Sequence, residues 1–291
     1  MEIALDVEWA HAIAPGAKIV LALAPSNADA DMVATQDYVI NHGIGDVISM
    51  SYVDGEQCMN PAVQQLEHTE FNKANARGVT IFAASGDWGA AQYTCDSSSF
   101  IKAVAVPASD PDVTGVGGTE LEADLTTGAY LNESVWNEIA FGFPNAGGGG
   151  FSTLYARPAF QNGVDGAGSM RGVPDVSDSA SVNDGTVIAW GSSGSPGEFW
   201  VSGGTSGATP QWAGIGAIAD QSARRDLGNI NPALYALSLG ANKGTIGFHD
   251  ILTGNNDFAP ISGYSAGHGW DAASGLGSPI ASDLVAALAR K

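Results

Sequence analysis

The first half of the chain alternates between helical and strand-like patterns, and this alternation constrains the fold more than any other feature. Helical spacing covers three segments: Glu2–Ala14, Ala30–His42 and Ala62–Arg77. Strands are expected at four short apolar runs: Lys18–Ala24, Asp46–Tyr52, Val79–Ala84 and Ala103–Val106. Strands and helices alternating at this spacing indicate an α/β fold, in which helices cover both faces of a mostly parallel sheet. In such sheets ligands bind beyond the carboxyl ends of the strands.

The remaining sequence is consistent with one domain over residues 1–291. The middle, Thr119–Gly197, is loop-rich and contains a glycine run at Gly147–Gly150. The hydrophobic content of 44% is ample for one core, and no internal repeat or linker divides the chain. We therefore expect a single catalytic or binding unit rather than two domains.

The charge balance excludes two classes of partner. The chain has 31 acidic against 11 basic residues and a formal net charge of −20. Nucleic acids and anionic membrane surfaces attract clusters of Lys and Arg, so neither is an expected partner. The longest apolar runs, such as Ile19–Pro25, are too short to cross a bilayer. An excess of carboxylates suits a protein that works in acid, where protonation reduces self-repulsion.

A run of small residues, Ser202–Pro210, places Ser206 just before an apolar stretch, Gln211–Ala219, that predicts a buried helix. Glycines let the backbone approach a substrate closely, and a helix start supplies free N–H groups and the positive end of the helix dipole. This geometry suits a nucleophilic serine, because the oxyanion that forms needs nearby donors. The alternative is that Thr205 or Ser206 simply caps the helix.

Glu2 and Asp6 are four residues apart in the first expected helix, so their side chains share one helix face. Two neighbouring carboxylates repel when both are ionised, which raises one pKa and favours a shared proton. Such a pair can accept a hydroxyl proton in acid, where an imidazole is already charged. Solvated helix faces also carry this spacing, so a surface role is the alternative.

Asp87 directly follows the expected buried strand Val79–Ala84 and the residues Ser85 and Gly86. An acid at the carboxyl end of a strand lies where an active site is expected. A carboxyl group kept protonated by burial and acid pH can donate a hydrogen bond to an oxyanion. The alternative is an ordinary turn aspartate.

The two cysteines, Cys58 and Cys95, allow one disulfide or two free thiols. Both follow expected strand ends, so a bond between them would join two loops above one edge of the sheet. A disulfide is favoured if the compartment is oxidising. No Cys or His spacing indicates a zinc site.

Along nearly its whole length the chain resembles the sedolisins, the serine-carboxyl peptidases, whose catalytic domain is an elaborated subtilisin-like fold. The resemblance rests on four ordered motifs and their separations. They are Glu2-x-x-x-Asp6 followed by Ala14-Pro15-Gly16-Ala17, Ala84-Ser85-Gly86-Asp87, Arg171-x-Val173-Pro174-Asp175-Val176, and Gly203-Gly204-Thr205-Ser206 with Pro210. The resemblance implies a three-layer, subtilisin-like architecture with a mostly parallel central sheet.

The resemblance also implies a role for each candidate residue. Ser206 would attack the scissile carbonyl, and Glu2 would act as general base and then as general acid. Asp6 would orient and tune Glu2, while protonated Asp87 would donate to the oxyanion. None of the five histidines lies in a His-Gly-Thr sequence, where a subtilisin-like fold keeps its histidine. A histidine-dependent hydrolase would instead need activity that rises towards neutral pH.

One structural calcium ion is implied by two further segments similar to the family's metal site, within a region around residues 249–271. Asp250 and Asp271 would supply carboxylate oxygens, and Ile251, Gly267 and Gly269 would supply backbone carbonyls. Hard oxygen ligands of this kind are those that Ca²⁺ prefers. Without the resemblance, these are two loop aspartates among glycines.

Family catalytic domains carry a segment before the catalytic Glu, including early elements of the sheet, and are made with a long propeptide. Because Glu2 is the second residue here, we expect an amino-terminally truncated domain. A missing strand would leave a sheet edge unpaired or a core face exposed. The expected partners are polypeptide substrates and the propeptide or missing segment, and the expected location is extracellular.

Two functions follow as expectations. The first is an acid-acting endopeptidase with a serine nucleophile. The second is a catalytically inactive, truncated relative that acts as a calcium-stabilised, secreted binding or scaffold domain.

Overall fold

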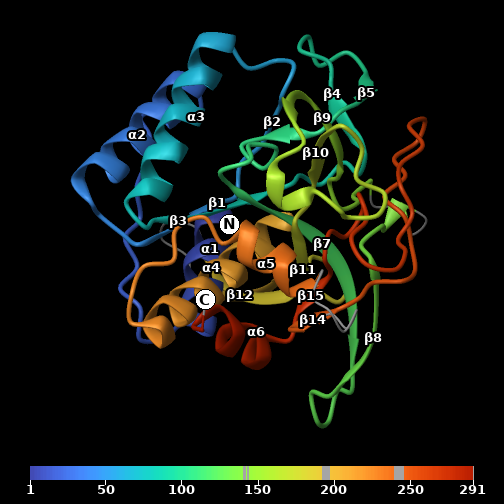
Figure 1. Cartoon of the computed structure of the whole chain (residues 1–291). Helices are drawn as coiled ribbons and strands as arrows, with labels where there is room; N and C mark the ends of the chain where they lie inside the picture. The colour runs from blue at the N-terminus through green and yellow to red at the C-terminus, as the bar shows by residue number, and fades with distance from the viewer. Residues whose placement is uncertain (140–141, 143, 192–196, 239–245, 291) are drawn as a thin grey trace.

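The computed structural model describes residues 1–139, 142, 144–191, 197–238 and 246–290 (Figure 1). Its centre is a sheet with the order β1-β3-β7-β11, to which β8 is added beside β7. The bounds of these strands are β1 Val47–Met50, β3 Thr80–Ala84, β7 Thr114–Ala123, β8 Tyr130–Val135 and β11 Val176–Ser179. Strands β1, β3, β7 and β11 run parallel, whereas β8 is antiparallel to the second half of β7.

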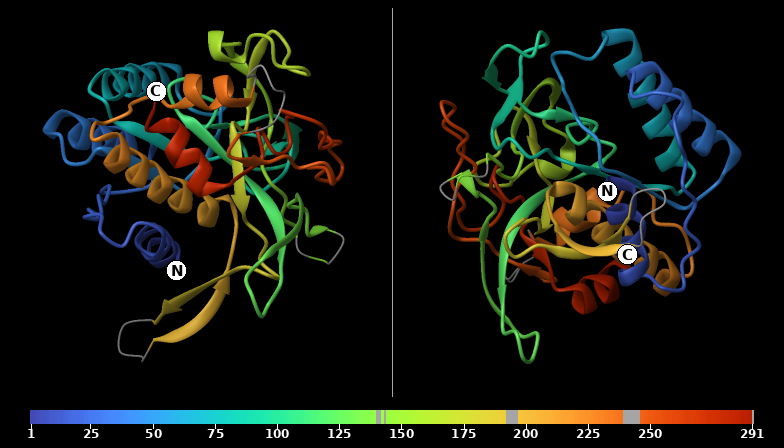
Figure 2. Two further views of the ribbon diagram at one scale, coloured as in Figure 1. Left: turned by 60° about the horizontal axis from the view of Figure 1, so that its bottom comes forward. Right: turned by 180° about the vertical axis from the view of Figure 1, so that it is seen from behind.

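Helices cover both faces of this sheet, as expected for a three-layer α/β fold (Figure 1). The bounds of the helices are α1 Glu2–Ile13, α2 Asp29–His42, α3 Pro61–Ala76, α4 Thr205–Ala223, α5 Asn231–Ser238 and α6 Ala281–Leu288. Helix α4 lies against one face, with α5 and α6 around it, and α2 and α3 lie against the other. Helix α1 packs on α4, and the pair β12–β13 projects beyond them (Figure 2).

The side chains of β3 contribute to a hydrophobic cluster on each face of the sheet, because successive residues of a strand point to opposite faces. Phe82 packs against Trp212 of α4 in one cluster of buried side chains. Ile81 and Ala83 lie in a second cluster with Phe71 of α3. The strand is buried along its whole length, which explains why it reads as a continuous apolar run.

Short paired strands decorate the main sheet. Their bounds are β2 Asp54–Gly55, β4 Ala91–Tyr93, β5 Phe100–Lys102, β6 Ala105–Val106, β9 Gly150–Ala156, β10 Met170–Val173, β12 Thr186–Trp190, β13 Glu198–Ser202, β14 Phe248–His249 and β15 Ser278–Pro279. They pair as β2 with β6, β4 with β5, β9 with β10, β12 with β13 and β14 with β15, and η2, Ala159–Gln161, is a short 3-10 helix. Within the described residues, no helix combines the length and apolar character needed to span a membrane.

The expected strand at Lys18–Ala24 is wrong. The segment forms no ladder with any described strand, and Val20, Leu21 and Leu23 are exposed. Strand β1 is the edge of the main sheet, and its outer side pairs with nothing in the described part of the chain. An apolar run becomes a buried strand only where a partner satisfies its backbone groups.

Three strands of the main sheet, β7, β8 and β11, were not anticipated. Gly115, Gly117 and Gly118 make β7 resemble a turn, yet each packs closely on a neighbour. A methyl group at Gly117 would lie 2.7 Å from the Pro174 ring, and one at Gly118 would lie 2.9 Å from Trp136. Glycine in this strand therefore permits close packing. The expected fourth strand, Ala103–Val106, contributes only β6 of a separate small sheet.

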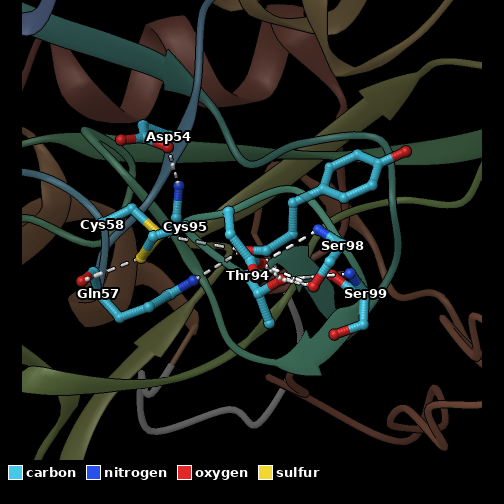
Figure 3. Close-up of a disulfide and its surroundings, with 10 residues drawn as sticks. Asp54, Gln57, Cys58, Thr94, Cys95, Ser98 and Ser99 are labelled. Carbon is cyan, nitrogen blue, oxygen red and sulfur yellow. Dashed lines mark hydrogen bonds between the residues drawn. A yellow bond between two sulfur atoms is a disulfide. The ribbon is translucent and has the colours of Figure 1, made fainter.

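A disulfide joins Cys58 and Cys95, which confirms that alternative (Figure 3). It connects the loop after β2, which carries Gln57, to the turn between β4 and β5, which carries Thr94 and Ser98. The amide of Gln57 adds a hydrogen bond of 3.0 Å to the carbonyl of Tyr93. The two loops therefore form one braced unit above the end of the sheet.

A buried ion pair occupies the Arg171–Val176 motif. Arg171 and Asp175 are both fully buried, and Arg171 Nη1 donates to Asp175 Oδ1 at 2.7 Å. The hydroxyl of Tyr235 and the backbone N–H of Gly115 donate to the same carboxylate. The motif thus ties β10, β7 and α5 together in the core.

Candidate active site

The four candidate catalytic residues converge at the carboxyl ends of β1 and β3. Ser206 is the second residue of α4, and Glu2 and Asp6 lie on α1, which packs against α4. Asp87 follows β3 after two residues. Ser51, directly after β1, lies among them. The structure therefore brings together residues that are far apart in the sequence.

Ser206 is presented by the first turn of α4. The preceding Gly204 adopts a φ of +92°, which favours glycine, and the chain then enters the helix. The Ser206 hydroxyl lies 3.4 Å from the Ser51 carbonyl oxygen. Pro210 has no N–H for the Ser206 carbonyl, which instead lies 3.3 Å from the Ser51 hydroxyl. The proline thus leaves this turn of the helix free to contact β1.

Glu2 lies close enough to the Ser206 side chain for that hydroxyl to lower the pKa of its carboxyl group, and a general base must lie near its proton donor. Partial desolvation raises the pKa of Glu2, the Ser206 hydrogen bond opposes this effect, and the nearby charge of Asp87 raises the pKa further. A raised pKa brings the base closer to the proton affinity needed to take and return a proton.

Asp6 accepts a hydrogen bond of 2.6 Å from the Ser51 hydroxyl at Oδ1. Burial raises the pKa of Asp6 from 3.8 to about 7, against the lowering effect of Ser51, and the charge of Glu2 contributes to the increase. In weak acid Asp6 is therefore protonated while Glu2, one helical turn away, titrates beside it. The pair differs in environment as an acid/base pair must.

Asp87 is held by the residue before the nucleophile. Its Oδ1 accepts hydrogen bonds of 2.8 Å from both the backbone N–H and the hydroxyl of Thr205. Its Oδ2 lies so close to Gly204 that a methyl group there would be 2.7 Å away. Burial raises the pKa of Asp87, despite the two Thr205 hydrogen bonds that lower it. When this carboxyl group is protonated, its Oδ2, beside Gly204, can donate a hydrogen bond near the first turn of α4.

Ser51 and Thr205 are the functional neighbours that sequence reasoning missed. Thr205 was considered only as a helix cap, yet its hydroxyl also accepts from the backbone N–H of Gly86 at 3.1 Å. Ser51 lay inside an expected strand and carried no distinguishing local signal. Its position at the carboxyl end of β1, one strand away from Asp87, was the available clue.

Close packing fixes α1, and with it Glu2 and Asp6. Leu5 is buried against the first turn of α4 near Gly207, and a methyl group at Gly214 would lie 2.7 Å from Ile13. The other side of α1 is tied to β12, since Trp9 Nε1 donates to the Val187 carbonyl at 3.3 Å. The helix therefore has little freedom to slide along α4.

The candidate calcium region forms one compact loop pair. Asp250 accepts from the backbone N–H of Gly269 at 3.1 Å, and Asp271 accepts from that of Gly267 at 3.0 Å. Among the described residues, nothing donates a hydrogen bond to the carbonyl oxygens of Ile251, Gly267 or Gly269. Two carboxylates and three free carbonyls make a donor set that fits a hard cation.

The fold and the site define a subtilisin-like protein with a serine nucleophile candidate set among carboxyl groups. No family model matches the chain. It is 37% identical to kumamolisin of Bacillus sp. (strain MN-32) over 298 residues, which cover 99% of this chain and 50% of that protein. It is 35% identical to sedolisin of Pseudomonas sp. (strain 101) over 220 residues, or 74% of this chain and 35% of that protein.

A solved structure, Pseudomonas sedolisin (serine-carboxyl proteinase) complexed with two molecules of pseudo-iodotyrostatin, is similar throughout the fold. The TM-score is 0.87 at 31% identity, covering 98% of this chain and 77% of that one. The chain belongs to the sedolisin family of serine-carboxyl peptidases. It spans half or less of the length of the two curated relatives.

Proposed function

We propose that this chain is an acid-acting endopeptidase that cleaves peptide bonds with Ser206. The observation that carries the proposal is the convergence of one hydroxyl with three carboxyl groups in different environments. Glu2 lies near the hydroxyl, Asp6 lies one turn further along α1, and Asp87 accepts from Thr205 in the nucleophile turn. This arrangement supplies a nucleophile, a base and an oxyanion donor in one place.

The reaction follows from the positions of these groups. Glu2 takes the proton from Ser206 Oγ as the oxygen attacks the scissile carbonyl carbon. Protonated Asp87 donates a hydrogen bond to the oxyanion of the tetrahedral intermediate. Glu2 then gives the proton to the leaving amine, and an acyl-enzyme remains. Water, activated by Glu2, releases the second product and restores Ser206. Asp6 tunes the proton affinity of Glu2 throughout.

The same groups account for the proposed acid optimum. The mechanism needs Glu2 ionised as a base and Asp87 protonated as a donor. Activity is therefore lost in strong acid when Glu2 is protonated, and lost at higher pH when Asp87 ionises. Burial of Asp87 raises its pKa and so widens the pH window on its upper side. A bell-shaped pH profile centred in acid is the expected form.

We propose that one structural Ca²⁺ is held by Asp250, Ile251, Gly267, Gly269 and Asp271. The two carboxylates would neutralise the ion, and the three carbonyls would complete an all-oxygen shell. The ion would join the loop after β14 to the loop before β15 and supply no step of the reaction. The support is the oxygen donor set described above.

Two further proposals concern where and with what the chain works. The substrates are polypeptides, and the exposed edge of β1 suits an added strand from a propeptide or another amino-terminal segment. An extracellular location is supported by the Cys58–Cys95 disulfide, because such bonds persist in oxidising compartments. The inactive scaffold alternative has no comparable support, since the four candidate side chains lie close together.

The test is hydrolysis of an unfolded protein substrate at about pH 4 with Ca²⁺ present, where a carboxylate base still functions. The unaltered chain is compared with Ser206→Ala, and circular dichroism verifies that both are folded. Cleavage that is lost in the variant supports the proposal. No cleavage by the folded, unaltered chain overturns the claim of activity for this polypeptide.

A further inference from the structure

A cavity of about 320 Å³ opens between the two loops that the disulfide braces. Val53 and Asp54 line one side, and Trp88 and Gln92 line another, with the Cys58–Cys95 bridge in its wall. Figure 3 shows Asp54 near the Cys58–Cys95 bridge. The cavity has apolar and polar walls and is distinct from the four catalytic side chains.

The cavity borders the catalytic group on two sides. Val53 follows Ser51, which contacts Ser206, by two residues. Gln92 reaches under Gly86, the residue before Asp87, so that a methyl group at Gly86 would lie 3.3 Å from Gln92 Nε2. A peptide whose scissile carbonyl lay between Ser206 and Asp87 would therefore extend toward this cavity.

The amide of Gln92 is the unusual feature of the cavity. The residue is only 1% exposed, yet neither its Nε2 nor its Oε1 has a hydrogen-bond partner. Neither neighbour bonds this amide: Asp54 accepts from the Gly55 N–H at 2.8 Å through Oδ1, and Gln57 donates to Tyr93. A buried amide with a free donor and a free acceptor costs free energy, which a ligand with both groups would recover.

We propose that Gln92 is a specificity-determining residue and that this cavity takes a substrate side chain ending in a carboxamide, that of glutamine. A carboxamide can donate to Oε1 and accept from Nε2 at once, which satisfies both free atoms. Val53, Trp88 and the disulfide would contact its methylene groups. This inference rests on the proposed peptidase function. It states that glutamine is the preferred substrate residue immediately before the scissile bond.

The carboxamide is favoured over charged or apolar alternatives. Lysine only donates and would leave Nε2 unpaired, while methionine pairs with neither atom. An ionised glutamate only accepts and also meets Asp54 in a protein of net charge −20. A protonated glutamate, however, both donates and accepts. Glutamate peptides should therefore approach glutamine peptides only below the ordinary glutamate pKa of about 4.3.

The test uses peptides that differ only at the residue before the scissile bond, with Gln, Met, Glu or Lys there. At about pH 4 we expect kcat/KM for the Gln peptide to exceed that for the Met peptide by about tenfold or more. Gln92→Met, which keeps the length and removes both polar atoms, should abolish or reverse this ratio. Gln57→Met is the matched control, because Gln57 does not itself line the cavity and its amide already has a partner in the Tyr93 carbonyl.

Binding of the same peptides to Ser206→Ala, measured by calorimetry, tests the subsite without turnover. A Gln preference that disappears with Gln92→Met in this background supports the subsite even if no cleavage is seen. Cleavage that depends on Ser206 but shows an unchanged Gln-to-Met ratio in Gln92→Met overturns the subsite and leaves the proposed function intact. A preference for the Lys peptide would also overturn the proposal, since it would show that the Asp54 carboxylate, and not the Gln92 amide, determines the specificity of the cavity. Thermal melting verifies that the variants are folded.

Discussion

The Ser51 hydroxyl lies 2.6 Å from Asp6 Oδ1. This hydrogen bond joins the end of β1 to α1, the helix that carries the two neighbouring carboxyl groups of Glu2 and Asp6. Because Ser51 also contacts Ser206 through its carbonyl oxygen, one residue spans both sides of the site. Its hydrogen bond lowers the pKa of Asp6 against the larger effect of burial. Ser51 is therefore a positioning residue whose loss should be visible in a pH profile.

Ser51→Ala is expected to raise the pKa of Asp6 further and to lower kcat/KM by about tenfold. The pH–rate profile should also move to higher pH, because Asp6 and Glu2 titrate together. Ser51→Thr, which keeps the hydroxyl, should restore most of the rate and the original profile. A fall in rate with an unchanged profile would contradict the tuning role.

The folded protein should be more stable in weak acid than at neutral pH. Burial raises the pKa values of Asp6, Glu67 and Asp178 to about 7. Each of these carboxyl groups therefore binds its proton more tightly in the folded than in the unfolded state. The resulting stabilisation is fully present below the ordinary carboxyl pKa values near 4, and it is lost as the pH rises through about 7. Urea denaturation of the inactive Ser206→Ala chain between pH 4 and pH 8 measures this slope. Glu67→Gln should make it shallower, and a slope of the opposite sign would refute the assignment.

Gly214→Ala should displace α1 and harm activity more than stability. The added methyl group would meet Ile13 at 2.7 Å, so α1 must shift away from α4. We expect a loss of about 1–3 kcal/mol in the free energy of unfolding. The same shift moves Glu2 and Asp6, so kcat should fall by about a hundredfold. Gly16→Ala, which meets nothing within 4 Å, is the control. Full activity in Gly214→Ala would show that the site tolerates movement of α1.

Arg171→Met should lower the free energy of unfolding by about 3–5 kcal/mol, because it leaves Asp175 as an unpaired buried charge. The double variant with Asp175→Leu removes that charge and should recover part of the loss. Denaturant titration of the two variants and the parent measures both effects. Equal stability of the single and double variants would show that the unpaired carboxylate is not the cause.

Removal of calcium should lower Tm by about 5 °C or more, since an ion that binds only the folded state stabilises it by mass action. Asp250→Asn should lose most of this response, because one of the two proposed carboxylates becomes neutral. Calorimetric scans with Ca²⁺ and with a chelator compare the two proteins. A parent Tm that is unchanged by the chelator would exclude a bound structural ion.

Much of the fold was accessible from pattern alone, and the errors have physical causes. Helices α2 and α3 and strand β3 lie where apolar spacing predicted them, because each buries one face or all of its residues. Strand β7 was missed because its glycines, which permit close packing on Pro174 and Trp136, also mark turns. Lys18–Ala24 was mispredicted because composition does not reveal whether a strand has a partner.

The sequence motifs predicted only those residues of the candidate site that lie within the motifs themselves. Ser206, Glu2, Asp6 and Asp87 were identified singly, and the structure brings them together. Ser51 and the unpaired amide of Gln92 could not be found this way. Both look ordinary in sequence, and their significance comes from neighbours that the fold supplies.

The separation of the catalytic groups along the chain affects when the site can exist during folding. Glu2 lies on α1, whereas Ser206 lies far along the sequence in the first turn of α4, which must first dock on β1 and β3. The site is thus made of contacts of high contact order, which form late. A partly folded chain has the serine without its proposed base, so the proposed peptidase activity would arise only with the complete topology. Newly made molecules would then not cleave one another while they are still unfolded, because each would become active only when it is also compact enough to resist cleavage.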